Sequence, residues 1–316
     1  MKKRIFSILL CVVTAFMAGC SSGSIKFGTS GEGGTYGEVA SALADSVHAD
    51  KENISFDVRT TAGSAANVRL LSQNYLDMAI AQADIIDNAY NGTGTFAGSK
   101  SYRGYAAVAG LYTEACQIVV SAESDIKTID DLEGKKVSIG EEESGTEQNA
   151  VQILAAYGLN KSFVDEINLD YSDACDQLKS GEIDAFFCTL APNSPIIKEL
   201  ASEYDIRLLG LSDAAIRKLV DAYGFYTKYT IEKGTYPNQS EDVNTIGVTA
   251  VLLAKEGLEK EQVKAIVEVL FRDKKEINAA VTADLKLDLE TAVKGISIPF
   301  HEGALEYYSE HGIDTN

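Results

Sequence analysis

Short apolar runs alternate along most of this chain with stretches whose apolar residues recur at helical spacing. Val39, Leu43 and Val47 stand four residues apart and predict one face of a helix. The segment 54–60 alternates apolar and polar positions as a half-buried strand does, and 78–81 reads as a short buried strand. This order of strands and helices predicts an α/β protein with parallel sheets.

The remaining predicted elements continue this alternation until the C-terminal part, where strand patterns stop. There we expect a helix at 262–280, with an apolar face that runs from Val263 to Phe271. Elsewhere we expect strands at 25–29, 105–111, 117–121, 137–139, 168–171 and 185–188. We expect helices at 65–71, at 146–157, and between the strand at 168–171 and Ser180.

The first twenty residues follow a pattern of their own. Basic residues at 2–4 precede an apolar run of 12 residues at 5–16, shorter than the about 20 needed to span a bilayer. This pattern is typical of a signal peptide, at 1–19, followed by a linker at 20–24. The ending Met17-Ala18-Gly19-Cys20 resembles a bacterial lipoprotein signal, in which Cys20 is lipidated. The alternative is cleavage of an ordinary signal peptide, with Cys20 not lipidated.

Charge narrows the classes of partner. The chain has 28 Lys and Arg against 47 Asp and Glu, a net charge of −19 over 316 residues. Removal of the predicted signal peptide leaves 25 basic and 47 acidic residues, a net charge of −22. Such acidity argues against nucleic-acid binding and against electrostatic docking on anionic lipid. The length suggests about two domains.

Three cysteines remain after Cys11 leaves with the signal peptide and Cys20 is lipidated. They are Cys116, Cys175 and Cys188, and no C-x-x-C motif occurs. An odd number cannot pair completely. We favour three buried thiols acting as small hydrophobic residues, and one disulfide is the alternative.

Three loops between a predicted strand and a predicted helix are candidate ligand contacts. The glycine-rich segment 28–37 matches neither a dinucleotide fingerprint nor a P-loop, so it is either a tight turn or a loop that admits a ligand. In 60–64, Ser64 is a candidate N-cap. Ser144 and Glu147 form a capping-box pattern, whereas Ser144 and Thr146 could instead face a ligand carboxylate.

Polar residues also follow two predicted strands. Gln82 ends the strand at 78–81, and Tyr112 and Glu114 follow the strand at 105–111. Ligand crevices of open α/β sheets lie beyond such strand ends. No catalytic motif is present, and no His/Cys cluster has metal-ligand spacing. We therefore expect no enzyme and assign no metal or cofactor.

Taken in order, the loops resemble those of the TAXI-type solute receptors of tripartite ATP-independent periplasmic (TRAP) transporters. The resemblance covers residues 25–313. It rests on 28–37 (GTSGEGGTYG), 60–71 (TTAGSAANVRLL), 78–98, 111–120, 131–150, 180–201, 242–254 and 298–312.

This resemblance implies a two-lobed type II periplasmic-binding-protein fold with a ligand cleft between the lobes. Lobe I would comprise 25–114 and 256–316, and lobe II 115–255. The implied ligand is a small organic acid or amino acid, glutamate among them. The implied partner is an integral permease driven by an ion gradient. The receptor would be extracytoplasmic and held at the membrane by its lipid anchor.

The resemblance also implies ligand-binding residues. Glu147 departs from the family, because some relatives have Arg there. An anionic ligand would then depend on helix N-termini, or on Arg59, Arg69 or Arg103. A sensory binding protein that signals to a membrane kinase is the alternative function. The positions that match the family's ligand loops are Thr35, Tyr36, Gly63, Ser64, Gln82, Tyr112, Ser144, Gly145, Thr146 and Asn193.

Overall fold

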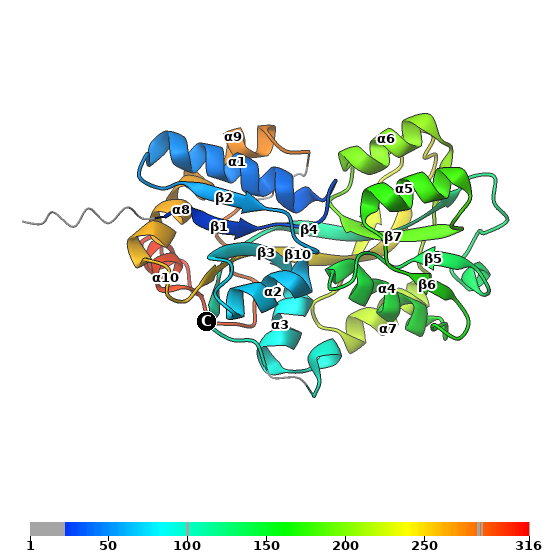
Figure 1. Cartoon of the computed structure of the whole chain (residues 1–316), viewed down its shortest axis with the longest axis horizontal. Helices are drawn as coiled ribbons and strands as arrows, with labels where there is room; N and C mark the ends of the chain where they lie inside the picture. Colours follow the sequence, from blue (N-terminus) through cyan, green and yellow to red (C-terminus); the bar gives the residue numbers. More distant parts are fainter. Residues whose placement is uncertain (1–22, 99–100, 283–284, 286, 316) are drawn as a thin grey trace, which may run out of the picture.

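The protein is built around one mixed β-sheet of ten strands (Figure 1). The computed structural model describes residues 23–98, 101–282, 285 and 287–315. Eight strands follow the order β2-β1-β3-β10-β4-β7-β5-β6, while β8 pairs with β4 and β9 pairs with β10. The predicted signal peptide and Cys20 lie outside the described residues.

The first half of the sheet consists of three parallel strands with helices on both faces (Figure 1). Apolar residues at a period of two or of about four place these elements where the sequence predicts them, except for the helix Ala83–Asn91, which was not predicted. The strands are β1 (Ile25–Gly28), β2 (Phe56–Arg59) and β3 (Met78–Gln82), and the helices are α1 (Thr35–Asp50), α2 (Ser64–Ser72) and α3 (Ala83–Asn91).

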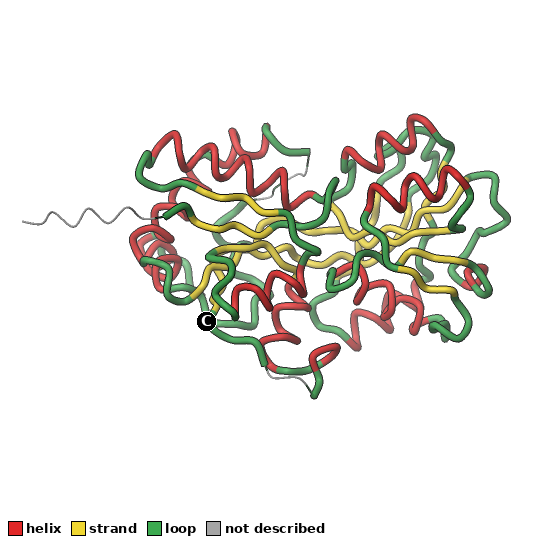
Figure 2. Tube along the Cα trace, viewed as in Figure 1, coloured by secondary structure: helices red, strands yellow, loops and turns green. Residues whose placement is uncertain are grey.

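Two long antiparallel strands, β4 (Tyr105–Ser121) and β10 (Val243–Lys255), run through the centre of the sheet (Figure 2). The prediction of two separate strands at 105–111 and 117–121 is wrong. The polar pair Thr113 and Glu114 interrupts the apolar pattern, but both residues still pair with β10. The strand therefore continues where the sequence pattern stops.

The second half of the sheet adds five strands and four helices. The strand expected at 168–171 lies earlier, because the Asp170 side chain caps the next helix by accepting from the Asp173 N–H at 2.8 Å. The elements are β5 (Lys136–Ser138), β6 (Asp165–Ile167), β7 (Ala185–Leu190), β8 (Ile206–Leu208) and β9 (Thr227–Ile231), with α4 (Gly145–Ala156), α5 (Tyr171–Ser180), α6 (Pro195–Glu203) and α7 (Asp213–Ala222).

Among the named strands of the described chain, parallel pairing occurs at the two ends of the sheet. Strand β1 pairs in parallel with β2 and β3, and β5 with β6 and β7. The central strands β4 and β10 make antiparallel pairs with each other and with their neighbours. The expectation of parallel sheets is thus correct for the outer strands and wrong for the centre.

The C-terminal helices return to the first half. The helix predicted at 262–280 is divided at Asp273 into α8 (Lys260–Arg272) and α9 (Lys274–Ala279), and α10 (Glu302–Glu310) follows. The predicted apolar face of α8, from Val263 to Phe271, is buried against the first half of the molecule. Among the described residues after α9, the sheet gains only an isolated bridge between Ala107 and Phe300.

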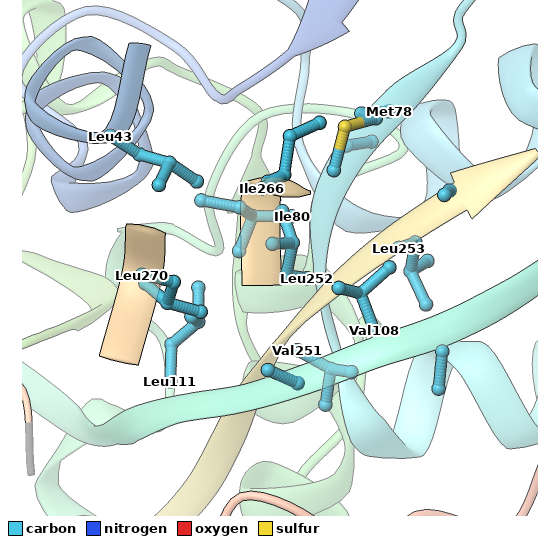
Figure 3. Close-up of a cluster of buried hydrophobic side chains, with 14 of the residues drawn as sticks. Leu43, Met78, Ile80, Val108, Leu111, Val251, Leu252, Leu253, Ile266 and Leu270 are labelled. Carbon is cyan, nitrogen blue, oxygen red and sulfur yellow. The ribbon is translucent and has the colours of Figure 1, made fainter. Parts of the chain in front are cut away.

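The largest hydrophobic cluster joins the first half to the C-terminal helices. Figure 3 shows Leu43 of α1, Ile80 of β3, Leu252 of β10 and Ile266 of α8 gathered around one centre. Residues 250–254 belong to this cluster, although the expected lobe division assigns 115–255 to the other lobe. Strand β10 therefore passes from one half to the other within its own length.

Two further clusters fill the second half, one on each face of its strands. Cys116 lies in one of them, and Cys175 and Cys188 lie in the other. All three cysteines are buried and free. The prediction of three buried thiols acting as small hydrophobic residues is confirmed.

Leu252 provides a test of the central pairing. Its side chain is fully buried on β10, opposite Ile80 and Ala109. We expect Leu252→Ala to lower the free energy of unfolding by ~2–5 kcal/mol, through lost burial and a residual cavity. Leu305→Ala, at a 39% exposed position of α10, is the control and should stay within ~0.5 kcal/mol. Urea unfolding measures both, and equal losses would contradict the prediction.

Candidate ligand-binding site

A small cavity lies where loops from both halves meet at the middle of the sheet. Its volume is about 30 Å³, which is room for one or two water molecules. Any larger solute therefore requires its walls to move apart. The lining residues are Ser30, Gly31, Thr35, Tyr36, Ala62, Gly63, Ser64, Gln82, Glu114, Glu141, Ser144, Gly145, Thr146, Asp170, Tyr171, Thr189 and Leu190.

Most of the residues suggested by the family resemblance line this cavity, and two do not. Tyr112 lies behind it, with its hydroxyl 3.5 Å from Glu114 Oε1. Asn193 has a φ of 66°, and its N–H donates to the Tyr236 hydroxyl at 3.2 Å, outside the lining. The eight that line the cavity are Thr35, Tyr36, Gly63, Ser64, Gln82, Ser144, Gly145 and Thr146.

Sequence reasoning did not select several lining residues. Glu114 was noted at a strand end where a ligand crevice is expected, but it was not included among the ligand-binding residues. No sequence pattern marked Glu141, Asp170 or Thr189, since each belongs to a different loop or strand end of the second half. The fold alone brings them together.

Three helices begin at the cavity, with their N-caps at Gly34, Gly63 and Ser144. The first turn of a helix carries a positive partial charge and unpaired N–H groups, which suit an anion. Ser144 both caps α4, accepting from the Glu147 N–H at 3.0 Å, and lines the cavity. The capping interpretation is therefore confirmed, and contact of Ser144 and Thr146 with a ligand stays a prediction.

The capping pattern around α4 differs from a reciprocal capping box. The Glu147 carboxylate accepts from the Glu143 N–H at 3.0 Å, one residue before the N-cap. The Ser144 N–H instead donates to the Glu141 carbonyl at 3.0 Å. Glu147 thus turns away from the cavity, and it is absent from the lining.

Ser64 does not cap α2, because Gly63, with a φ of 117°, occupies the N-cap. The Ser64 hydroxyl accepts from the Gln82 N–H at 3.1 Å and lies 3.3 Å from the Tyr36 hydroxyl. It therefore ties the end of β3 to α1 and α2. Across the cavity, Gly145 leaves space for the Gln82 side chain, which any larger residue at 145 would overlap.

Glu114 is the buried acid of the site. Its side chain is 1% exposed, and Oε2 accepts from the Tyr36 hydroxyl at 2.8 Å. Burial raises the pKa of Glu114 to about 8, although hydrogen bonds from Tyr36 and Gln82 favour the charged form. The Glu114 carboxyl is therefore mostly protonated at neutral pH.

Asp84 is a second buried acid, in the first turn of α3. Burial raises its pKa to about 6. Its Oδ2 accepts from Gln148 Nε2 at 3.2 Å and from Asn149 Nδ2 at 3.3 Å, both on α4. Asp84 thus connects the two walls of the cavity.

A second connection between the walls involves Glu143. The Arg69 guanidinium donates to both of its carboxylate oxygens, at 2.9 and 2.5 Å. The Glu143 carbonyl accepts from the N–H groups of Ala65 and Ala66, at 3.1 Å each, in the first turn of α2. These contacts hold the loop before α4 against the start of α2.

The lining carries negative and neutral groups only. Its acidic residues are the mostly protonated Glu114 together with Glu141 and Asp170, and no Lys, Arg or His of the described chain lines it. The three basic residues considered for an anionic ligand are engaged elsewhere: Arg59 with Asp57, Arg69 with Glu143, and Arg103 over the ring of Tyr90.

Within the described segments, no three His, Cys, Asp or Glu side chains are grouped closely enough to hold a metal ion. None of the helices there combines the length and the apolar character that crossing a bilayer requires.

Solved structures with the same architecture define the class of fold. A protein from Bordetella bronchiseptica RB50 is 14% identical, with 92% of this chain and 99% of that chain covered and a TM-score of 0.58. An ancestral arginine-binding protein bound to arginine is 17% identical, with 83% and 99% covered and a TM-score of 0.51. The alkanesulfonate-binding protein of Xanthomonas axonopodis pv. citri bound to MOPS is 15% identical, with 81% and 77% covered and a TM-score of 0.50.

The fold is therefore the two-lobed type II periplasmic-binding-protein fold, as the sequence resemblance implies. The chain belongs to the NMT1-like family, whose model matches residues 27–312.

The buried Glu114 predicts a pH dependence of stability. Its ordinary pKa of 4.5 rises to about 8 in the folded protein, so the folded state binds this proton more tightly. The resulting stabilisation is complete below about pH 4.5 and is lost as the pH rises through about 8. Glu114→Gln cannot ionise. Its free energy of unfolding should therefore rise relative to that of the unchanged protein as the pH increases from about 4.5 to about 8.

Denaturant unfolding at a series of pH values measures this difference. The exposed Glu123→Gln is the control and should follow the unchanged protein throughout. Parallel curves for Glu114→Gln and the unchanged protein would show that Glu114 is ionised in the folded state.

Proposed function

We propose that this protein is an extracytoplasmic receptor that binds a small organic acid or amino acid in the cavity between its halves. The observation that carries the proposal is the convergence of three helix N-termini and buried polar side chains on one small cavity. Polar groups that converge on one cavity and are fixed by rigid elements are what orients a small molecule in its site. The fold supports it, since two of the structural neighbours are an arginine-binding protein and an alkanesulfonate-binding protein.

The proposed lobes are 25–114 with 256–316, and 115–255, with the change of lobe on β10 inside the strand rather than at its end. Strands β4 and β10 then form the hinge. Opening breaks the Arg69–Glu143 ion pair and the bonds of Asp84 to α4. A solute that contacts both walls favours the closed form, because it has differential affinity for that state.

The proposed partner is the integral permease of a TRAP transporter, which an ion gradient drives rather than ATP. The support is the resemblance of the loops at 28–37, 60–71 and 131–150 to TAXI receptors. Lipidation of Cys20 would keep the receptor beside that permease, at the outer face of the membrane.

Solute binding is tested by unfolding in the presence of a panel of small carboxylates and amino acids, glutamate among them. A solute present at 100 times its Kd should stabilise the protein by ~2.7 kcal/mol. Gly145→Leu should abolish this stabilisation, because a side chain at 145 overlaps Gln82 and fills the cavity.

Gly257→Leu is the matched control, because no heavy atom lies within 4 Å of its Cβ position. It should respond to the solute as the unchanged protein does. A panel in which no member stabilises the protein, or in which Gly145→Leu responds fully, would contradict the proposed site.

Anchoring is tested by Cys20→Ala. The variant should appear in the soluble fraction, or accumulate as unprocessed precursor, because it cannot carry the lipid. Cys11→Ala, within the apolar run of the same predicted signal, is the control and should remain at the membrane. Fractionation and the mass of the mature chain measure both. A processed Cys20→Ala protein that stays membrane-bound would rule out the lipid anchor.

A further inference from the structure

One part of the cavity, formed by Glu114 and Gln82, presents hydrogen-bond acceptors. Both side chains line the cavity and are at most 2% exposed. Gln82 Oε1 has no hydrogen-bond partner among the described residues. A buried acceptor without a donor costs free energy, which a donor on the ligand would recover. This acceptor pair therefore suits a ligand group that donates hydrogen bonds.

The charges around the cavity do not complement the negative charge of an organic acid. Glu141 and Asp170 line it together with Glu114, and no basic side chain of the described residues does so. Asp84 adds a buried carboxyl beside Glu114. A dicarboxylate would have one end at a helix N-terminus and the other among these acids, where like charges repel.

We propose that the solute is a zwitterionic amino acid, whose ammonium group binds Glu114 and Gln82 while its carboxylate lies at a helix N-terminus. An ammonium has three donors and no acceptor, which matches the two acceptors. The first turns of α2 and α4, across the same cavity, suit the carboxylate. Glu114 is then the residue that selects amino acids over organic acids. This inference rests on the proposed function and names its solute class.

Binding of an ammonium has a consequence for the proton on Glu114. A cation beside this carboxyl favours its ionised form, so the proton passes to the buffer as the solute binds below about pH 8. The other titratable groups that face Glu114 are neutral hydroxyls and thiols or the second acid. They are Tyr36 of α1, Asp84 of α3, Tyr112 and Cys116 of β4, and Tyr171 of α5.

Calorimetric titration of the purified protein tests the proposal, with amino acids each paired with the corresponding 2-oxo acid, such as L-glutamate with 2-oxoglutarate. The keto oxygen of the 2-oxo acid removes the donors and the positive charge but leaves the rest of the solute unchanged. We expect a bound amino acid to exceed its 2-oxo acid by about 10- to 100-fold in affinity, the range for a hydrogen bond to a charged group.

Glu114→Gln should lose a similar factor for the amino acid while its affinity for the 2-oxo acid does not fall. Glu166→Gln is the matched control, a half-buried carboxyl on β6 outside the cavity, and should bind as the unchanged protein does. Titration of the unchanged protein at pH 7 in two buffers of different ionisation enthalpy should reveal proton release. The proton-release measurement tests the role of Glu114 even if the Glu114→Gln variant does not fold.

The outcomes separate the two proposals. A 2-oxo acid that binds as tightly as its amino acid, or an amino acid that binds without proton release, would overturn the role of Glu114 and leave the solute receptor standing. Binding of neither set would contradict both the receptor and the solute class.

Discussion

The antiparallel pairing of β4 with β10 is the interaction on which the rest of this structure depends. It joins Gly247 to Ala115 at one end and Lys255 to Tyr105 at the other, so both halves of the sheet share these two strands. The other strands of each half extend from this pair, through β3 on one side and β7 on the other. The pair also carries Glu114 to the middle of the molecule, where it faces the cavity. In the proposed function, these two strands are the hinge about which the halves close.

The electrostatics of the site follow from its position inside an acidic protein. The global field of a chain with a net charge of −19 repels anions, so local donors have to provide any attraction. Three helix N-termini supply positive partial charge on the walls of the cavity. Burial keeps the Glu114 proton in place at neutral pH, which lowers the cost of its desolvation. These two features are the basis on which we propose that the site binds a carboxylate and an ammonium of one solute.

Local sequence patterns predicted much of the fold, and their failures have physical causes. The strand at 105–121 was split because Thr113 and Glu114 look like a strand end, whereas pairing with β10 keeps them extended. Ser64 was expected to cap α2, but tertiary bonds to Gln82 and Tyr36 take its hydroxyl, and a left-handed Gly63 provides the N-cap. Strand β10 was not predicted, because Asn244, Thr245 and Thr249 interrupt its first part, and the apolar run at 250–254 does not by itself distinguish a buried strand from a helix.

The amino-acid sequence was enough to locate α1, β3 and α8 and the loops that begin three helices, because periodicity and capping residues act between near neighbours in the chain. It also carried the family resemblance, since that depends on the order of motifs. Only the tertiary structure decided which residues meet at the cavity. Glu114, Glu141 and Asp170 come together through long-range strand pairing, and Arg59, Arg69 and Arg103 are drawn to other partners. Side-chain environment depends on contacts between distant segments, which no local pattern encodes.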